Sequence, residues 1–216
     1  MTGLYLHIPF CVTKCHYCNF VITTSNSAKN HSLFLEALEK EIRHHKSYFE
    51  KDVFDTCYLG GGTPSVLSAE ETRTLFDLIR KNFKFKKNAE VTCEVNPGDV
   101  REETAENYAA LGVNRVSFGA QSFQDTTLKY LNRRHNAQDI VDSFCALRNA
   151  GFKNISLDLI LSLPGENLSG VEHSVSELLR LSPEHVSLYE LTIEEKTVFG
   201  NWIMTAACSR IMAVGK

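Results

Sequence analysis

Short apolar runs recur along the chain and alternate with segments of helical periodicity. Six runs rich in β-branched and aromatic residues predict strands, at 5–8, 56–59, 90–95, 115–120, 155–163 and 185–193. Their apolar content is too dense for antiparallel sheets with one solvated face, so we expect parallel strands, five of them buried. The segments between them repeat apolar residues every three or four positions, which is typical of helices packed on a sheet.

Four apolar faces and several end signals define the predicted helices. The faces consist of Leu35, Leu38, Ile42 and Phe49; Leu75, Leu78, Ile79 and Phe83; Ile140, Phe144 and Leu147; and Val171, Val175, Leu178 and Leu179. Ser68 and Glu71 have the spacing of a capping box. Gly112 and Gly151 follow helical segments, where a left-handed cap is expected. Strands that alternate with helices favour right-handed crossovers, so we expect an α/β fold, a ring or arc of six units ending near Phe199.

The chemically unusual segments all follow predicted strands. They are the cysteine loop (11–18), GGGTP (60–64), NPGD (96–99), QSF (121–123) and LPGE (163–166). Functional residues of parallel α/β folds gather at the carboxyl ends of the strands. We therefore expect one site, at a single rim of the sheet.

The first of these segments carries three closely spaced cysteines. Cys11, Cys15 and Cys18 form a C-x3-C-x2-C pattern, and thiolates are suitable ligands for iron–sulfur clusters or zinc. Structural zinc uses four ligands, and no second C-x-x-C pair follows. His16 could be a fourth ligand but lies inside the loop. Three thiolates suit a four-iron cluster that leaves one iron free for another ligand.

Composition and charge exclude several classes of protein. The 216 residues carry a net charge of -3 and are 43% hydrophobic, which fits one globular domain and gives no basic footprint for nucleic acid. No apolar run is long enough for a transmembrane helix, and we expect no leader and a cytoplasmic location. The cysteines number seven and are expected to be reduced thiols. Cys57, Cys93 and Cys145 are predicted core thiols, and Cys208 lies in the tail.

The motifs resemble those of the radical S-adenosylmethionine (SAM) superfamily. Y-x-HIPFC, GGGTP, E-x-NP, G-x-QS and D-L-I-x-x-LP occur in that family's order between about Tyr5 and Phe199. The details are similar to its branch of oxygen-independent coproporphyrinogen III oxidases and HemW-type heme chaperones. The resemblance implies a partial (β/α)6 barrel with parallel strands. It also implies a [4Fe–4S] cluster on Cys11, Cys15 and Cys18 whose open iron binds SAM.

The resemblance also implies which residues bind SAM. They are Gly61, Gly62 and Thr63 at the methionine end, Glu94 and Arg133 at the charged amino-acid part, Gln121 and Asp158 at the ribose, and Tyr5 at the cluster side. Glu190 is a further candidate beside the adenine. A carboxylate such as Asp158 inside an apolar strand is costly without a partner, which favours a functional role. The choice of Arg133 over Arg134 rests on its spacing from Gln121.

Two functions of different classes are consistent with this resemblance. An oxidase would use a 5′-deoxyadenosyl radical from SAM to decarboxylate coproporphyrinogen III to protoporphyrinogen IX. A chaperone would bind heme and deliver it to a respiratory protein. The oxidases resemble C-x3-C-x2-C-x-C, whereas Asn19 and Phe20 follow Cys18 here, which favours the chaperone. Either function implies heme or a porphyrinogen as ligand and an electron donor such as a flavodoxin or ferredoxin.

The histidines do not indicate a heme ligand by their spacing. His7 belongs to the first motif and is expected to order the cluster loop. The others considered are expected at solvated or helix-end positions; they are His44, His45, His135, His173 and His185.

The domain prediction is a radical SAM core at 1–199 and an unassigned tail at 200–216. The family continues into a C-terminal domain that the tail does not resemble, so we expect this domain to be missing and heme capture to be weak. A zinc-binding α/β module is a distant alternative.

Overall fold

The computed structural model of the chain describes residues 1–163 and 165–205 and contains one six-stranded sheet. The strands are β1 Gly3–Ile8, β2 Val53–Gly61, β3 Lys84–Val95, β4 Arg115–Gln121, β5 Ile155–Leu161 and β6 His185–Glu190. They pair in sequence order, and every pair is parallel. The predicted strand order and direction are confirmed.

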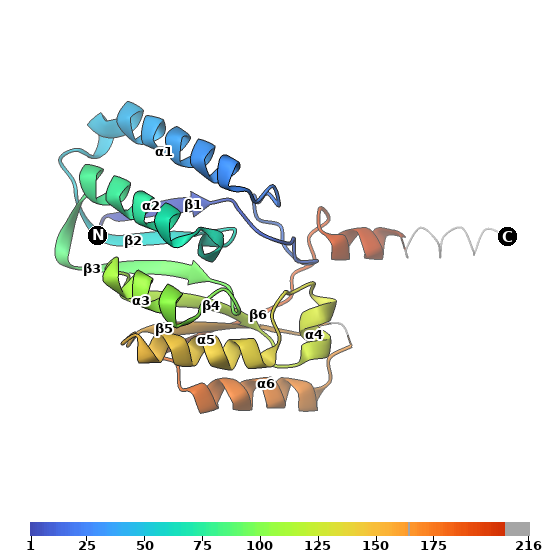
Figure 1. Cartoon of the computed structure of the whole chain (residues 1–216). Helices are drawn as coiled ribbons and strands as arrows, with labels where there is room; N and C mark the ends of the chain where they lie inside the picture. The colour runs from blue at the N-terminus through green and yellow to red at the C-terminus, as the bar shows by residue number, and fades with distance from the viewer. Residues whose placement is uncertain (164, 206–216) are drawn as a thin grey trace.

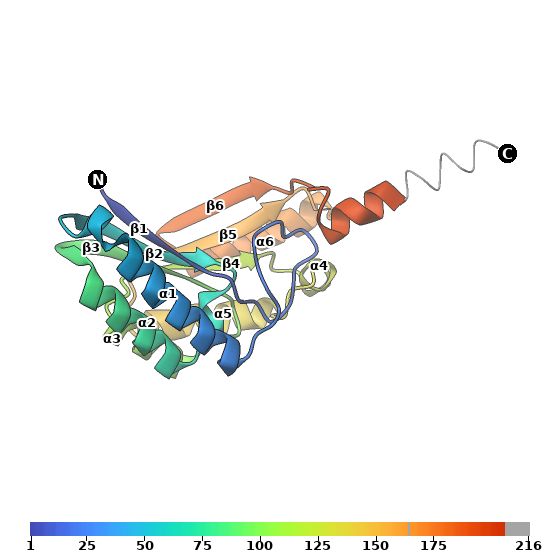
Figure 2. The same cartoon turned by 90° about the horizontal axis from the view of Figure 1, so that it is seen from above.

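Helices connect successive strands. They are α1 Ala28–Phe49, α2 Ala69–Asn82, α3 Glu102–Ala110, α4 Asp125–Tyr130, α5 Ala137–Asn149 and α6 Leu168–Leu181, with a short 3-10 turn at Pro64–Val66. Figures 1 and 2 show the sheet as a curved wall whose convex side is covered by helices. Among the described residues β1 and β6 remain the two edges of the sheet, so it is an arc and not a closed barrel. The predicted partial (β/α)6 architecture is confirmed.

The strands alternate between two faces. Apolar side chains such as Leu59 and Leu157 are buried against the helices. Their neighbours Tyr58, Glu94 and Asp158 lie on the opposite, concave face, because successive strand residues point to opposite sides. The helices therefore cover an apolar face, and the arc encloses a polar one.

The predicted helix ends are confirmed. Ser68 Oγ accepts a hydrogen bond from the Glu71 amide at 3.2 Å, and the Glu71 carboxylate accepts one from the Ser68 amide at 2.8 Å. Gly112 and Gly151, which follow α3 and α5, have φ angles of +78° and +92°. Only glycine adopts such angles without a steric penalty, so both positions end their helices.

Several burial predictions are wrong. Leu179 and Cys145 are exposed, because their neighbours Leu178 and Phe144 occupy the core side of α6 and α5 and a helix turns about 100° per residue. His135, expected at a solvated or helix-end position, lies directly before the N-cap residue of α5 but is buried, with 4% of its surface exposed. The sixth predicted strand ends at Glu190 rather than at residue 193.

The chain remains ordered in helical form past the predicted core boundary, since residues 198–205 are helical. Pro164 of LPGE, Cys208 and the tail from residue 206 lie outside the described residues. Within residues 1–163 and 165–205, none of the helices combines the length and apolarity needed to cross a lipid bilayer.

Candidate functional site

A cavity of about 310 Å³ lies at the carboxyl ends of the strands, as expected for this fold. Of the eleven residues predicted for the cluster and SAM, ten line it: Cys11, Cys15, Cys18, Gly61, Gly62, Thr63, Glu94, Gln121, Arg133 and Asp158. The eleventh, Tyr5, is not part of the lining. Segments separated by up to about 150 residues therefore meet at one rim.

The cysteine loop is held by backbone contacts at its start and at its far side. The Cys11 amide donates to Thr23 O at 3.0 Å, and the Thr23 amide donates to Pro9 O at 2.8 Å. Further along, the His16 amide donates to Leu131 O at 3.1 Å. Figure 2 shows the resulting path, in which the loop between β1 and α1 reaches α4. These contacts fix the loop over the cavity.

The three thiols face this cavity in a partly buried environment. Cys11 Sγ lies 3.4 Å from Thr63 Oγ1, and Cys15 Sγ lies 3.5 Å from Arg133 Nη1. Burial raises the pKa of both Cys11 and Cys18, and the Thr63 hydroxyl opposes the rise at Cys11.

The donor atoms bear on the kind of metal group that the thiols can bind. All three cysteines line the same cavity as free thiols. Thiolates are the soft ligands that iron–sulfur clusters use, so the chemistry of the donor set fits such a cluster.

The glycine segment lies against the base of the cysteine loop. Gly61 has a φ of +112°, and a Cβ atom there would lie 2.5 Å from His7 Nδ1. A Cβ atom on Gly62 would lie 2.6 Å from Phe10 O. The Gly62 and Thr63 amides donate to Ile8 O and Phe10 O, both at 2.8 Å. Glycine is required at both positions, because the His7 ring lies close to Gly61 and the backbone of the preceding loop lies close to Gly62.

Glu94 is held at the end of β3 by two donors. The Tyr58 hydroxyl donates to Oε1 at 2.7 Å, and the Gly61 amide lies 3.2 Å from Oε2. Tyr5 stacks on Tyr58 with ring centroids 6.0 Å apart and is 57% exposed. Tyr5 therefore lies outside the cavity and packs on Tyr58, the residue that donates a hydrogen bond to Glu94.

His7 orders the cluster loop as expected. Its Nε2 lies 2.8 Å from Val21 O, which can only accept, so Nε2 carries the proton. Nδ1 then accepts from the Tyr5 hydroxyl at 3.2 Å. The ring joins β1 to the returning end of the cysteine loop.

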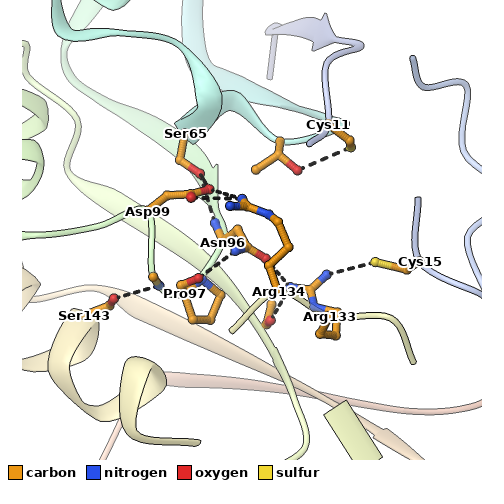
Figure 3. A network of polar contacts seen from close by, with 12 residues as sticks. Cys11, Cys15, Ser65, Asn96, Pro97, Asp99, Arg133, Arg134 and Ser143 are labelled. Atoms are coloured by element: carbon orange, nitrogen blue, oxygen red, sulfur yellow. Dashed lines mark hydrogen bonds and ion pairs between the residues drawn. The ribbon is translucent and has the colours of Figure 1, made fainter. Parts of the chain in front are cut away.

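Arg133 projects from the segment after α4 into the middle of the site. Its Nη2 donates to Asn96 Oδ1 at 2.6 Å and to Gly119 O at 2.8 Å (Figure 3). Its buried Nε has no hydrogen-bond partner among the described residues. Arg134 instead forms two hydrogen bonds with Asp99, at 2.8 and 2.9 Å. Of these two arginines, only Arg133 keeps an unused buried donor, which fits an anionic ligand.

Gln121 ends β4 in a strained conformation. Its φ is +70°, unusual for a residue other than glycine, and its side chain is buried. The Tyr189 hydroxyl donates to Gln121 Oε1 at 2.8 Å, which leaves the amide nitrogen as the free group. A Cβ atom on Gly119 would lie 2.8 Å from that nitrogen, so Gly119 makes room for it.

Asp158 lies on the concave face of β5. Burial raises the pKa of its carboxyl group, and a hydrogen bond from Ser187 opposes the rise. A half-buried acid with incomplete compensation is typical of a ligand-binding position.

Asn96, Tyr17 and Tyr189 are among the cavity residues that the sequence did not predict. Asn96 belongs to the E-x-NP motif, and a buried amide directly after a strand is the signal that could have identified it. Tyr17 lies between two cysteines and its hydroxyl is 3.4 Å from Arg133 Nη1. On β6 the lining residue is Tyr189, whereas the suggested Glu190 is exposed and lies outside the lining.

Comparison with known proteins places this site in a family. The radical SAM superfamily profile matches residues 5–178. The heme chaperone HemW of Bacillus subtilis is 41% identical over 202 residues, which cover 93% of this chain and 53% of that protein. HemW of Escherichia coli is 36% identical over 92% of this chain and 53% of its own length.

A solved structure shares the fold closely. The coproporphyrinogen III oxidase HemN of Escherichia coli, described as a radical SAM enzyme, superimposes with a TM-score of 0.86 at 29% identity. The match covers 92% of this chain and 45% of that one. The chain thus spans about half the length of the relatives it matches. With its profile match, its parallel arc and three cysteines at the rim, the chain belongs to the radical SAM superfamily.

Proposed function

We propose that the chain is the SAM-binding core of a HemW-type heme chaperone. The observation that carries the proposal is the segment after the third cysteine. Asn19 and Phe20 follow Cys18, so Phe20 stands where the oxidase pattern C-x3-C-x2-C-x-C has a fourth cysteine. Phe20 lines the cavity and is 69% exposed. The likeness to proteins named heme chaperone HemW, along more than nine-tenths of the chain, supports this choice.

The cysteines are proposed to bind three irons of a [4Fe–4S] cluster. When bound, the cluster and SAM supply one-electron chemistry at the sulfonium group. Burial favours the protonated form of Cys11 and Cys18, but a cluster binds cysteines as thiolates, so both thiols must lose a proton. The positive charge of the nearby Arg133 guanidinium assists by stabilising the thiolates. Thr63 donates to the Cys11 thiolate and orients it.

The remaining lining residues are proposed to bind SAM by charge and hydrogen bonding. Glu94 accepts from an α-amino group, and the free Nε of Arg133 donates to an α-carboxylate. Gln121, whose oxygen Tyr189 occupies, donates from its amide nitrogen to a ribose hydroxyl, and Asp158 accepts from one. Gly61 and Gly62 allow the segment to pack against the cysteine loop, so Thr63 can face the cavity.

Heme is proposed as the delivered ligand, a flavodoxin or ferredoxin as electron donor, and a respiratory protein as heme acceptor. The second candidate is coproporphyrinogen III oxidation, which the close structural match to HemN favours. The two functions differ in what the protein does with a porphyrinogen: the chaperone leaves it unchanged.

Anaerobic reconstitution with iron, sulfide and reductant tests both functions. We expect iron and sulfide to bind, little conversion of coproporphyrinogen, and at best weak heme binding. 5′-Deoxyadenosine is assayed in the same samples, with and without coproporphyrinogen. A variant with Cys11, Cys15 and Cys18 all changed to alanine should bind no cluster, whereas Cys145→Ala, at an exposed thiol, should behave as wild type. Conversion to protoporphyrinogen would overturn the chaperone proposal.

A further inference from the structure

His16 lies in the cysteine loop but faces away from the cavity. Cys15 and Tyr17 line the cavity, whereas His16 does not. His16 Nδ1 lies 2.8 Å from Tyr130 O, and a carbonyl oxygen only accepts, so Nδ1 carries a proton. In the neutral ring Nε2 therefore holds the lone pair, and it has no hydrogen-bond partner within the described residues. A fixed tautomer with a free Nε2 is the usual arrangement of a metal-binding histidine.

The His16 ring lies in a group of aromatic side chains that we call the aromatic surface: Tyr130, Phe199 and Trp202. The His16 ring centroid is 5.0 Å from that of Trp202 and 5.8 Å from that of Phe199. Tyr130 stacks on Phe199 at 5.0 Å, and the Phe199 amide donates to His16 O at 3.1 Å. Phe199 is buried with 2% of its surface exposed, whereas Tyr130 is 37% and Trp202 47% exposed, so these two rings are the part of the surface open to a flat apolar ligand.

The other histidines lack this combination. His7 and His31 use both ring nitrogens in hydrogen bonds, His135 is buried, and His185 Nδ1 lies 2.8 Å from Ser156 Oγ on the concave face. His44, His45 and His173 are exposed, and no hydrogen bond fixes their rings within residues 1–163 and 165–205.

We propose that His16 Nε2 is a ligand to heme iron, with the porphyrin against the aromatic surface. The inference rests on the proposed heme function and names its binding site. Heme has the required chemistry: an iron that accepts imidazole nitrogen and an apolar macrocycle. The site lies on the outer side of the loop whose inner side carries the cluster cysteines.

The test is an anaerobic heme titration of the cluster-loaded 216-residue protein, followed by its Soret band and electron paramagnetic resonance spectrum. His16→Gln keeps an amide that can donate to Tyr130 O but removes the iron ligand. We expect at least a tenfold weaker heme affinity, loss of the histidine-ligand signature, and its return with added imidazole. Iron, sulfide and SAM binding should stay at wild-type levels. The control His173→Gln should bind heme as wild type does.

A second variant lies outside the cysteine loop and so leaves the cluster ligands undisturbed. Trp202→Ala should weaken heme binding about tenfold while the histidine-ligand spectrum of the bound fraction persists. Wild-type affinity and spectrum in His16→Gln, or wild-type affinity in Trp202→Ala, would overturn this site and leave the heme function standing. A wild-type protein that binds no heme would also overturn this site, whereas conversion of coproporphyrinogen to protoporphyrinogen would overturn the proposed function itself.

Discussion

Arg133 donates a 2.6 Å hydrogen bond to Asn96, and this contact sets where the guanidinium points in the cavity. Asn96 is itself fixed, because its Nδ2 donates to Pro97 O at 2.6 Å and its backbone amide donates to Ser65 Oγ at 3.1 Å (Figure 3). Gly119 O takes a second bond from the same arginine nitrogen. The geometry makes Asn96 a positioning residue for Arg133.

Asn96→Ala should therefore weaken SAM binding without removing the cluster. A hydrogen bond to a charged group contributes about 1.5–3 kcal/mol, so its loss predicts roughly a tenfold or greater rise in the SAM dissociation constant. Calorimetry on the reconstituted protein measures this, with iron content determined in parallel. Asn149→Ala, at the exposed end of α5, is the control. Unchanged SAM affinity in Asn96→Ala would rule out the positioning role.

Gly61 and Gly112 offer a matched pair for the glycine segment. Both have positive φ angles, so alanine at either position costs about 1–2 kcal/mol of backbone strain. Only at Gly61 does the new Cβ meet another group, His7 Nδ1 at 2.5 Å; at Gly112 nothing lies within 4 Å. We expect Gly61→Ala to lower both the thermal midpoint and cluster content, and Gly112→Ala to lower the midpoint alone. Equal cluster content in the two variants would contradict this.

The sequence predicts the strand order and the shared rim because those features depend on local patterns. Each apolar run forms a strand, and parallel strands place their carboxyl ends together whatever the details of packing. The sequence therefore predicts, without any information on side-chain contacts, that the cysteine loop, Gly61 and Glu94 share one cavity.

Local sequence patterns do not predict which side chains contact each other or how each helix is rotated about its axis. Asn96 matters because Arg133, 37 positions later, reaches it, and a single sequence gives no sign of that contact. The apolar pattern of the sequence places Cys145 and Leu179 on buried helix faces, but the rotation of α5 and α6 turns both side chains outward. His135 is buried because the segment after α4 folds back under β4, where Ala120 O accepts from its ring.

Tyr189→Phe tests how Gln121 is oriented. Loss of the hydroxyl removes the 2.8 Å hydrogen bond to Gln121 Oε1, so the side-chain amide of Gln121 can rotate. One neutral hydrogen bond contributes about 0.5–1.5 kcal/mol, which predicts a two- to tenfold weaker SAM affinity. Equilibrium dialysis with labelled SAM measures it. Leu188→Ala, at an exposed neighbour on β6, should leave the affinity unchanged; equal affinities in Tyr189→Phe and wild type would contradict the role.

His135 should make the stability of the protein depend on pH. Burial, assisted by the charge of Arg133 and opposed by the hydrogen bond to Ala120 O, lowers the pKa of His135 to about 3. The pKa of an unfolded histidine is about 6.5, so below that pH the unfolded chain binds a proton that the native state excludes. The stabilisation is complete above pH 6.5 and is lost progressively as the pH falls towards 3.

Between pH 7 and pH 5 this one residue should remove about 2 kcal/mol of unfolding free energy, at about 1.4 kcal/mol per pH unit. His135→Gln keeps a donor for Ala120 O but does not titrate. Between pH 7 and pH 5 this variant should therefore lose about 2 kcal/mol less unfolding free energy than the wild type does. Urea unfolding of the cluster-free protein at both pH values measures the difference. His173→Gln, at an exposed position on α6, should match wild type. If wild type and His135→Gln lose stability equally between these pH values, His135 is charged in the native state and its burial does not exclude the proton.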